Sequence, residues 1–157
     1  MLKLGIMEGI KIVAKNRKAK FEFELGETYE AGLELRGSEI KSIRAGQVSL
    51  QEAYVRTNGE QAWLVGAHIA AYDQASIFNH EPERERRLLL HKREIKALWE
   101  GIRIKGMTIV PTIMYLKNGR AKVEIALAKG KRLYDKRQDI KKRDMDREIN
   151  RAMDDRR

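Results

Sequence analysis

The sequence predicts a mainly β fold with short helices: a small, closed or nearly closed antiparallel barrel followed by a basic C-terminal tail. Three observations lead there. Apolar and charged residues alternate repeatedly through the first 128 residues, and two Asn-Gly pairs separate such runs. After Ala128 the alternation stops and the composition changes.

The first alternating run predicts a β-hairpin. Phe21, Phe23 and Leu25 alternate with glutamates, and a turn is expected at Gly26-Glu27. Residues 29–35 alternate in the same way. Because one face of each strand is charged, this hairpin should keep one side in water.

The clearest hairpin comes later in the chain. Residues 113–117 and 121–128 flank Asn118-Gly119, a pair that tolerates the positive φ angles of a two-residue turn. Asn58-Gly59 should join two further strands, and Leu88-Leu89-Leu90 should form the core of another. The oligonucleotide-binding fold is one barrel with such short strands, but the pattern alone does not choose the topology.

Two helices should interrupt the strands. The first has Ser38 as its expected N-cap and Gly46 as its stop, and it places Lys41 and Arg44 on the solvent side. The second spans residues 92–105, where apolar residues have amphipathic spacing, and we expect it to plug the sheet.

The chain should divide into a barrel, residues 1–128, and a tail, residues 129–157. The tail holds 12 basic and 7 acidic residues but few apolar ones. Met145, Ile149 and Met153 form a thin helical stripe, which is marginal in water without a partner surface. We therefore expect the tail to be disordered alone and to fold on binding.

Charge composition points to nucleic acid. The chain has 157 residues, a formal charge of +10 and a pI near 9.9, which favours phosphate polymers as partners. No apolar stretch approaches the roughly 20 residues of a membrane span. The apolar stretch of the N-terminal segment is too short for a signal peptide. Without cysteine there are no disulfides, so the cytoplasm is the expected location.

Signatures of catalysis and metal binding are missing. His68, His80 and His91 are scattered, without partners at metal-ligand or triad spacing. Gly130-Lys131 lacks the first glycine of a phosphate-binding loop. Asp144, Asp146 and Glu148 lack the glycine and the full oxygen set of a calcium loop and lie among arginines. We expect no catalytic residue, no metal and no cofactor, and an RNA-modifying enzyme or nuclease has no candidate nucleophile.

Several basic segments are spread along the chain, a distribution suited to a folded RNA recognised by backbone and shape. Aromatic residues make up only 6% and mostly take inward strand positions, so a stacking platform for single strands is less expected. Tyr134 is the exception, because it lies outside the core beside Asp135, Lys136 and Arg137.

Five strings then resemble the SsrA-binding protein (small protein B, SmpB) family, in that family's order and over nearly the whole chain. They are Asn16-Arg17-Lys18-Ala19, Tyr29 to Leu33, Gly37 to Gly46, Leu88 to Ile95, and Ala128 to Arg137.

The resemblance implies an oligonucleotide-binding-like barrel that binds the transfer-RNA-like part of transfer-messenger RNA (tmRNA, SsrA RNA) as a monomer, without catalysis. The residues it implies for RNA binding are Asn16, Arg17, Lys18, Glu30, Lys41, Arg44, Leu89, Lys92, Lys122, Lys129 and Lys131. Among them Glu30 stands out, because a carboxylate in a basic site repels phosphate unless it accepts from a base amino group, a 2′-hydroxyl or a neighbouring Arg or Lys. The alternative is a surface carboxylate paired with a lysine, which contributes little.

The resemblance also implies that the tail enters the empty messenger channel of the small ribosomal subunit near the decoding site, becomes helical there, and so permits trans-translation and ribosome rescue. The implied tail residues are Tyr134, Asp135, Lys136, Arg137, Lys141, Lys142, Arg143, Met145, Ile149 and Met153. Position 134 is Tyr where many members have His, and position 145 is Met where many have Trp. A structural ribosomal or assembly protein using the same basic surface is the alternative function.

Overall fold

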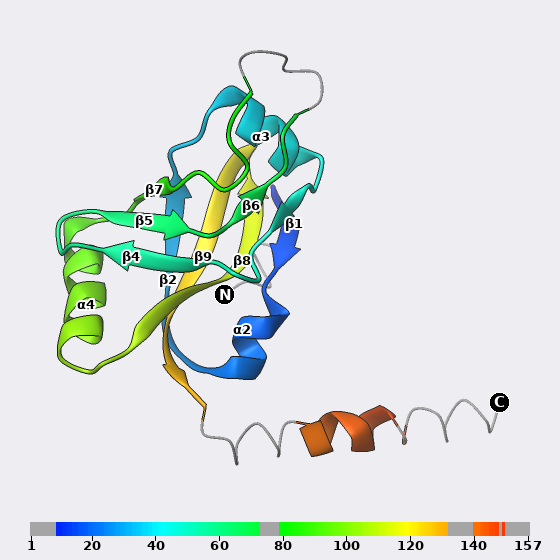
Figure 1. Ribbon diagram of the computed structural model, residues 1–157, viewed down its shortest axis with the longest axis vertical. Helices are drawn as coiled ribbons and strands as arrows, with labels where there is room; N and C mark the ends of the chain where they lie inside the picture. Colours follow the sequence, from blue (N-terminus) through cyan, green and yellow to red (C-terminus); the bar gives the residue numbers. More distant parts are fainter. Residues whose placement is uncertain (1–8, 73–78, 132–139, 148, 150–157) are drawn as a thin grey trace.

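The computed structural model describes residues 9–72, 79–131, 140–147 and 149. Seven strands of these residues form one antiparallel sheet in the order β1-β8-β9-β2-β7-β5-β4, and two short strands, β3 and β6, pair separately (Figure 1). The strands are β1 (Ile10–Lys15), β2 (Phe23–Leu33), β3 (Val48–Ser49), β4 (Tyr54–Thr57), β5 (Ala62–Val65), β6 (His68–Ile69), β7 (Arg86–Leu89), β8 (Thr108–Lys117) and β9 (Arg120–Gly130). The helices are α2 (Arg17–Glu22), α3 (Gly37–Arg44) and α4 (Lys92–Arg103), and residues 140–147 form a further helix.

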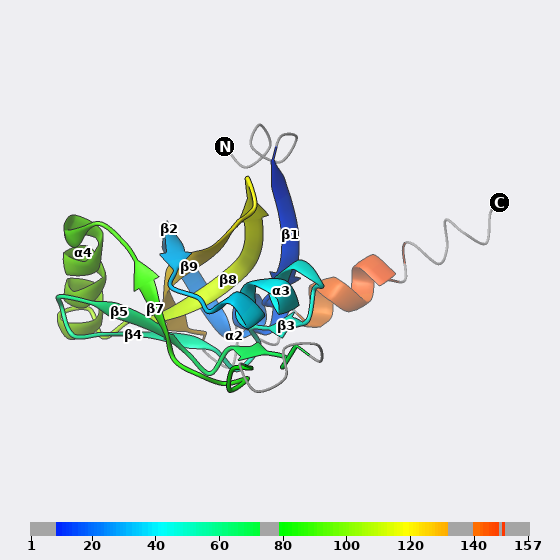
Figure 2. The same ribbon diagram turned by 90° about the horizontal axis from the view of Figure 1, so that it is seen from above.

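The sheet coils on itself, so that β4 and β5 pass across β8 and β9 (Figures 1 and 2). Its two edge strands, β1 and β4, are not neighbours in the hydrogen-bonded order. The predicted mainly β, antiparallel class with short helices is therefore confirmed, whereas the oligonucleotide-binding-like barrel is not closed. Its interior is filled by fully buried aliphatic side chains, among them Ile43, Leu64, Met114, Val123 and Ile125. No helix of the described residues is long and apolar enough to cross a membrane.

The β8–β9 hairpin forms where the Asn-Gly pair predicted it. Lys117 pairs with Arg120, and between them Asn118 and Gly119 have φ angles of 52° and 81°. Such angles give the turn a twist that matches the flanking strands. The strands are longer than the alternation indicated, and β9 continues to Gly130.

The predicted hairpin around residues 21–35 is wrong. Residues 17–22 form helix α2, and β2 then runs through the expected turn without reversing. Asn16 explains the helix: its Oδ1 accepts from the Ala19 amide at 3.1 Å, while its Nδ2 donates to the carbonyls of Leu50 and Pro111 at 3.0 and 2.9 Å. These contacts 34 and 95 residues away fix the helix start, and local alternation cannot reveal them.

The expected turn at Gly26-Glu27 is a β-bulge instead. Leu25 pairs with Ala128 and Thr28 with Ala126, so β2 carries one more residue than β9 over this stretch. A bulge bends and twists a strand, and β2 needs that curvature because it pairs with β9 along most of its length and with β7 at its end.

Helix α3 begins one residue before the predicted N-cap. Its N-cap is Arg36, whose amide donates to the Glu39 carboxylate at 2.8 Å. Ser38 instead pairs its hydroxyl with Nδ1 of the buried His80 at 2.8 Å, and the Nε2–H of that ring donates to the Ile69 carbonyl. The expected stop at Gly46 is confirmed by its φ of +75°.

Helix α4 matches its prediction closely, ending at Arg103 rather than at residue 105. Its N-cap amide, at His91, donates to Glu94 at 3.0 Å. Ile95 and Leu98 are buried, and Gly101 allows close approach to Leu127: an added Cβ would lie 2.7 Å from a Leu127 methyl group.

A buried ion cluster joins α3 to β7. Glu39 and Arg86 are both fully buried, and Arg86 Nε donates to Glu39 Oε2 at 2.6 Å. Arg84 donates to the other carboxylate oxygen at 2.5 Å, and Arg86 also donates to the carbonyls of Ala67 and Pro82. Burial acts to raise the pKa of Glu39, but hydrogen bonds from Arg84, the Arg36 amide and Arg86 outweigh it and lower that pKa.

We predict that Glu39→Gln lowers the free energy of unfolding by about 3–5 kcal/mol, because it leaves Arg86 charged and uncompensated in the interior. Urea unfolding followed by circular dichroism measures this. The matched control is Glu52→Gln, which breaks the exposed Lys18–Glu52 pair of 2.8 Å and should change the free energy of unfolding far less, because solvent screens that pair. Equal losses for the two variants would contradict the structural importance of the buried cluster.

The same cluster sets a pH dependence. Because the folded-state pKa of Glu39 is lowered, its contribution is complete above the unfolded-state pKa of about 4.3 and is lost as pH falls through the folded-state pKa. Glu39→Gln should therefore not show the loss of stability that protonation of Glu39 causes in the wild type at acid pH. Acid unfolding followed by circular dichroism measures the difference between the two proteins.

Candidate nucleic-acid interface

A cleft of about 590 Å³ lies on the outer side of the sheet, where β2, β7 and β9 meet the start of α4. The strand register builds it: Gly32 of β2 lies opposite Leu89 of β7 on one side and Lys122 of β9 on the other. Glu30 and Lys92 also line the cleft. The structure thus brings together four of the side chains that the sequence predicted, Glu30, Leu89, Lys92 and Lys122.

The floor of the cleft depends on Gly32. A Cβ at this position would lie 3.3 Å from Leu89 Cβ and 3.6 Å from Lys122 Nζ. Gly32 itself is buried, because these two side chains close over its backbone. The cleft here presents an apolar side chain that is 50% exposed beside an ammonium group. A second hollow, of about 350 Å³, shares Gly32, Leu89 and Lys122 and extends toward the start of α3.

Glu30 is held in place by neighbours on β8. The Tyr115 hydroxyl donates to Glu30 Oε2, and Lys117 Nζ lies 3.6 Å from the same oxygen. Burial, and then the hydrogen bond to Glu30, raise the pKa of Tyr115, so the phenol stays a donor. An ionised carboxylate has about four lone-pair sites, which leaves Glu30 able to accept from a ligand as well.

Lys41 and Arg44 lie apart from the cleft floor, on the exposed side of α3. Lys41 Nζ is 5.5 Å from the Tyr72 ring centroid, and Arg44 donates to the Gly119 carbonyl in the β8–β9 turn at 3.5 Å.

Asn16, which the resemblance places in RNA binding, is 5% exposed and has both ends of its amide hydrogen-bonded inside the protein. The structure therefore gives Asn16 a structural role at the start of α2.

The remaining predicted cations of the barrel lie near α2 and the end of β9. Lys18 pairs with Glu52, and that hydrogen bond raises the Lys18 pKa. Lys129 lies opposite Glu24 in the β2–β9 pairing.

Arg17 and Lys131 line a third cavity, of about 420 Å³, between α2 and the helix at 140–147. Lys20 and Phe21, absent from the predicted site, complete its barrel side. Their place on α2 was not predicted, because Phe21 was expected to begin a strand and Lys20 to precede it.

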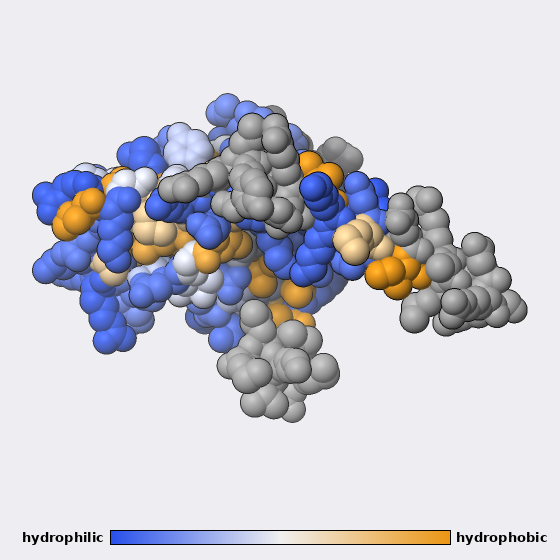
Figure 3. Space-filling model, turned by 90° about the horizontal axis from the view of Figure 1, so that it is seen from below, coloured by the Kyte–Doolittle hydropathy of each residue, from blue (hydrophilic) through white to orange (hydrophobic). Residues whose placement is uncertain are grey.

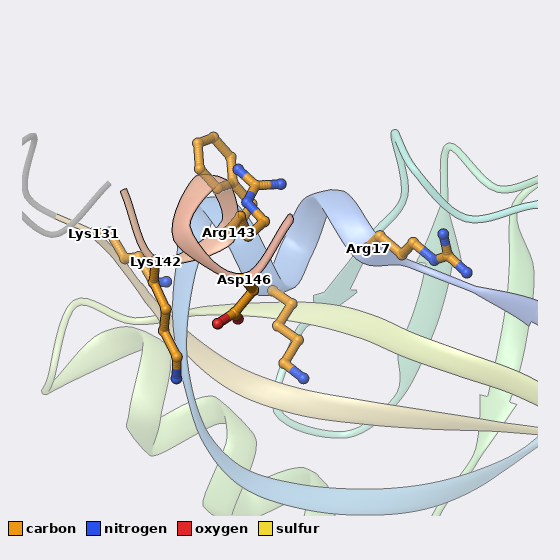
Figure 4. Close-up of a pocket in the computed structure, with 7 residues that line it drawn as sticks. Arg17, Lys131, Lys142, Arg143 and Asp146 are labelled. Atoms are coloured by element: carbon orange, nitrogen blue, oxygen red, sulfur yellow. The ribbon is translucent and has the colours of Figure 1, made fainter. Parts of the chain in front are cut away.

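The helix at 140–147 contributes Lys142, Arg143 and Asp146 to this cavity (Figure 4). The Arg143 guanidinium lies 4.7 Å from the centroid of the Phe21 ring. Lys141, Met145 and Ile149 are exposed. Figure 3 shows apolar side chains among hydrophilic ones on one face of the molecule. Tyr134, Asp135, Lys136, Arg137 and Met153 lie outside the described residues.

Metal binding has no geometric basis in the part of the chain that the structure describes. No three His, Asp or Glu side chains among these residues are placed to hold an ion. Of the three histidines, His80 is buried in its contacts with Ser38 and Ile69, and His68 and His91 are exposed.

The chain is similar in sequence and in structure to proteins of one family. The family model described as SmpB protein matches residues 13–155. The SsrA-binding protein of Desulforudis audaxviator is 54% identical over 142 residues, covering 90% of this chain and 93% of its own, and that of Nostoc punctiforme is 51% identical over 147 residues, covering 93% and 95%. A solved structure described as "tmRNA-SmpB: a journey to the center of the bacterial ribosome" aligns with a TM-score of 0.65 at 40% identity, covering 80% of this chain and 86% of that one.

Proposed function

The chain belongs to the SmpB protein family, and on this premise we propose that it binds the transfer-RNA-like part of transfer-messenger RNA and delivers that RNA to stalled ribosomes. The observation that carries the proposal is the cleft in which the strand register brings Glu30, Leu89 and Lys122 together, with Lys92 from the start of α4 beside them.

The composition of the cleft favours RNA. Lys92 and Lys122 supply positive charge for phosphates, and the exposed Leu89 supplies an apolar contact for a sugar or base. A carboxylate repels phosphate, so the lone pairs of Glu30 that Tyr115 and Lys117 leave free would accept from other groups of the ligand. RNA offers base amino groups and the 2′-hydroxyl that DNA lacks.

We assign contact with the ribosome to the C-terminal tail, which includes the helix at 140–147. Figure 2 shows α4 at one end of the molecule and the helix at 140–147 at the other. The start of α4 lines the cleft. Lys141, Lys142 and Arg143 of this helix can meet ribosomal-RNA phosphates. In this proposal residues 129–157 probe the empty messenger channel of the small subunit while residues 1–128 hold the tmRNA, and peptide tagging follows.

We further propose that the protein acts in the cytoplasm as a binding protein and not as an enzyme. Among the described residues, the cleft lining holds no nucleophile paired with a base.

We predict that Glu30→Ala weakens tmRNA binding by about 10- to 100-fold, because donors on the RNA then lose a charged acceptor. Filter binding or electrophoretic mobility shift measures the change. Glu24→Ala, an exposed carboxylate on the same strand, is the matched control and should bind as the wild type does. Unchanged tmRNA affinity of a folded Glu30→Ala variant would contradict the role of Glu30 in RNA recognition.

Gly32→Ala should also weaken RNA binding, because the new Cβ pushes Leu89 from its place and raises the cleft floor. Stability should change by less than about 1 kcal/mol, since Leu89 is half exposed and can move. Gly130→Ala is the control, as its Cβ would meet no atom within 4 Å. If both variants bind equally well, the cleft surface at Gly32 is not part of the binding site.

Truncation after Lys131 should leave a folded barrel that still binds tmRNA but cannot support tagging on stalled ribosomes. The cut keeps the Lys131 amide bonded to the Glu22 carbonyl at 3.0 Å. It removes the stacking of Arg143, in the helix at 140–147, on Phe21, which is worth about 0.5–1 kcal/mol. Tagging and RNA affinity measured side by side provide the test, and full tagging by the truncated chain would refute the channel-probing role.

A further inference from the structure

Three residues form a row across β4, β5 and β7, on the outer face of the sheet. Arg56 pairs with Trp63, and Trp63 pairs with Arg87. Because side chains alternate along a strand, these three point away from the core, while their neighbours Val55, Leu64 and Arg86 point into it and are buried.

The row has a stacked geometry. The Arg56 guanidinium carbon lies 4.2 Å from the Trp63 ring centroid. Glu85 also binds this guanidinium, with its Oε2 3.0 Å from Arg56 Nη2. The two contacts favour one orientation of the guanidinium before a ligand binds, which lowers the side-chain entropy lost on binding.

The row is continuous with the cleft. Arg87 belongs to both, since it also lines the 590 Å³ cavity beside Leu89. Its side chain is 48% exposed, and that of Arg56 is 46% exposed. An RNA strand leaving the cleft across β7 would therefore meet Trp63 and Arg56 next.

We propose that Arg56, Trp63 and Arg87 form a stacking site for an unpaired base of the RNA whose backbone the cleft holds. The inference rests on the proposed RNA binding and adds a base contact to it. Aromatic rings and arginine planes are the surfaces on which proteins stack splayed bases. Arg87 Nη1 lies 3.5 Å from Glu34 in a weak ion pair. On binding, Arg87 would leave Glu34 and pair with the phosphate of the stacked nucleotide.

The two tryptophans permit a site-resolved test. Trp99→Phe leaves Trp63 as the sole tryptophan, and Trp63→Phe leaves Trp99, which packs beside Gly59 on the other side of the β4–β5 loop. Titration with tmRNA should quench Trp63 fluorescence strongly and Trp99 fluorescence much less. A fully paired RNA duplex should leave Trp63 unquenched even where it binds.

Affinity supplies the second readout. Arg56→Ala and Arg56→Lys should each weaken tmRNA binding by about tenfold, because lysine keeps the charge but not the plane. Arg103→Ala removes an exposed arginine at the far end of α4 and should bind nearly as the wild type does. Thermal unfolding should show all three variants folded, since the Arg56–Glu85 pair is solvent-exposed.

The outcomes separate this inference from the function beneath it. Binding of tmRNA by the wild type without Trp63 quenching, or Arg56→Lys affinity equal to wild type, overturns the stacking site and leaves the cleft intact. Failure of the wild type to bind tmRNA overturns the proposed function itself.

Discussion

The ion pair between Glu39 and Arg86 is the interaction on which the rest of the fold depends. It joins α3 to β7, and the remaining Arg86 donors tie β7 to the carbonyls of Ala67 and Pro82. A charge buried this deeply is tolerated only with its partners in place, so the pair selects one register for β7. With Arg86 turned inward, Arg87 must face outward, and Leu89 with it.

The outer face of the sheet, whose residues that register determines, carries the side chains of the candidate RNA-binding cleft. β7 places Leu89 against Gly32, β9 places Lys122 on the other side, and β8 supports Glu30 through Tyr115. The cleft thus combines an apolar side chain, cations and one oriented carboxylate. A surface with cations alone would bind any polyanion, whereas a carboxylate that needs a donor penalises ligands without one.

Local patterns predicted the parts of this architecture whose causes are local. The Asn118-Gly119 turn needs positive φ angles that few other residues adopt, and α4 follows from amphipathic spacing bounded by Gly106, so both were found. Helix α2 was not, because Asn16 fixes its start through carbonyls far along the chain. The outward stack of Trp63 on Arg56 also depends on pairing between strands, which composition cannot show. Of the candidate site, the family strings supplied residue names, and only the register showed which of them meet.

The cavity between α2 and the helix at 140–147 bears on how a tail could serve a second partner. Five of its lining side chains are cationic and one, Asp146, is acidic, so like charges face one another there at a cost. Stacking of Arg143 on Phe21 offsets it by no more than about 1 kcal/mol at an exposed site. Ribosomal phosphates would relieve the repulsion and satisfy the same cations with charge-assisted hydrogen bonds. The proposed transfer of this helix from the barrel to an RNA groove is therefore favoured by electrostatics at both ends. It requires no rearrangement of the sheet, because the cleft is built from strands whose register the buried Glu39–Arg86 pair has already fixed.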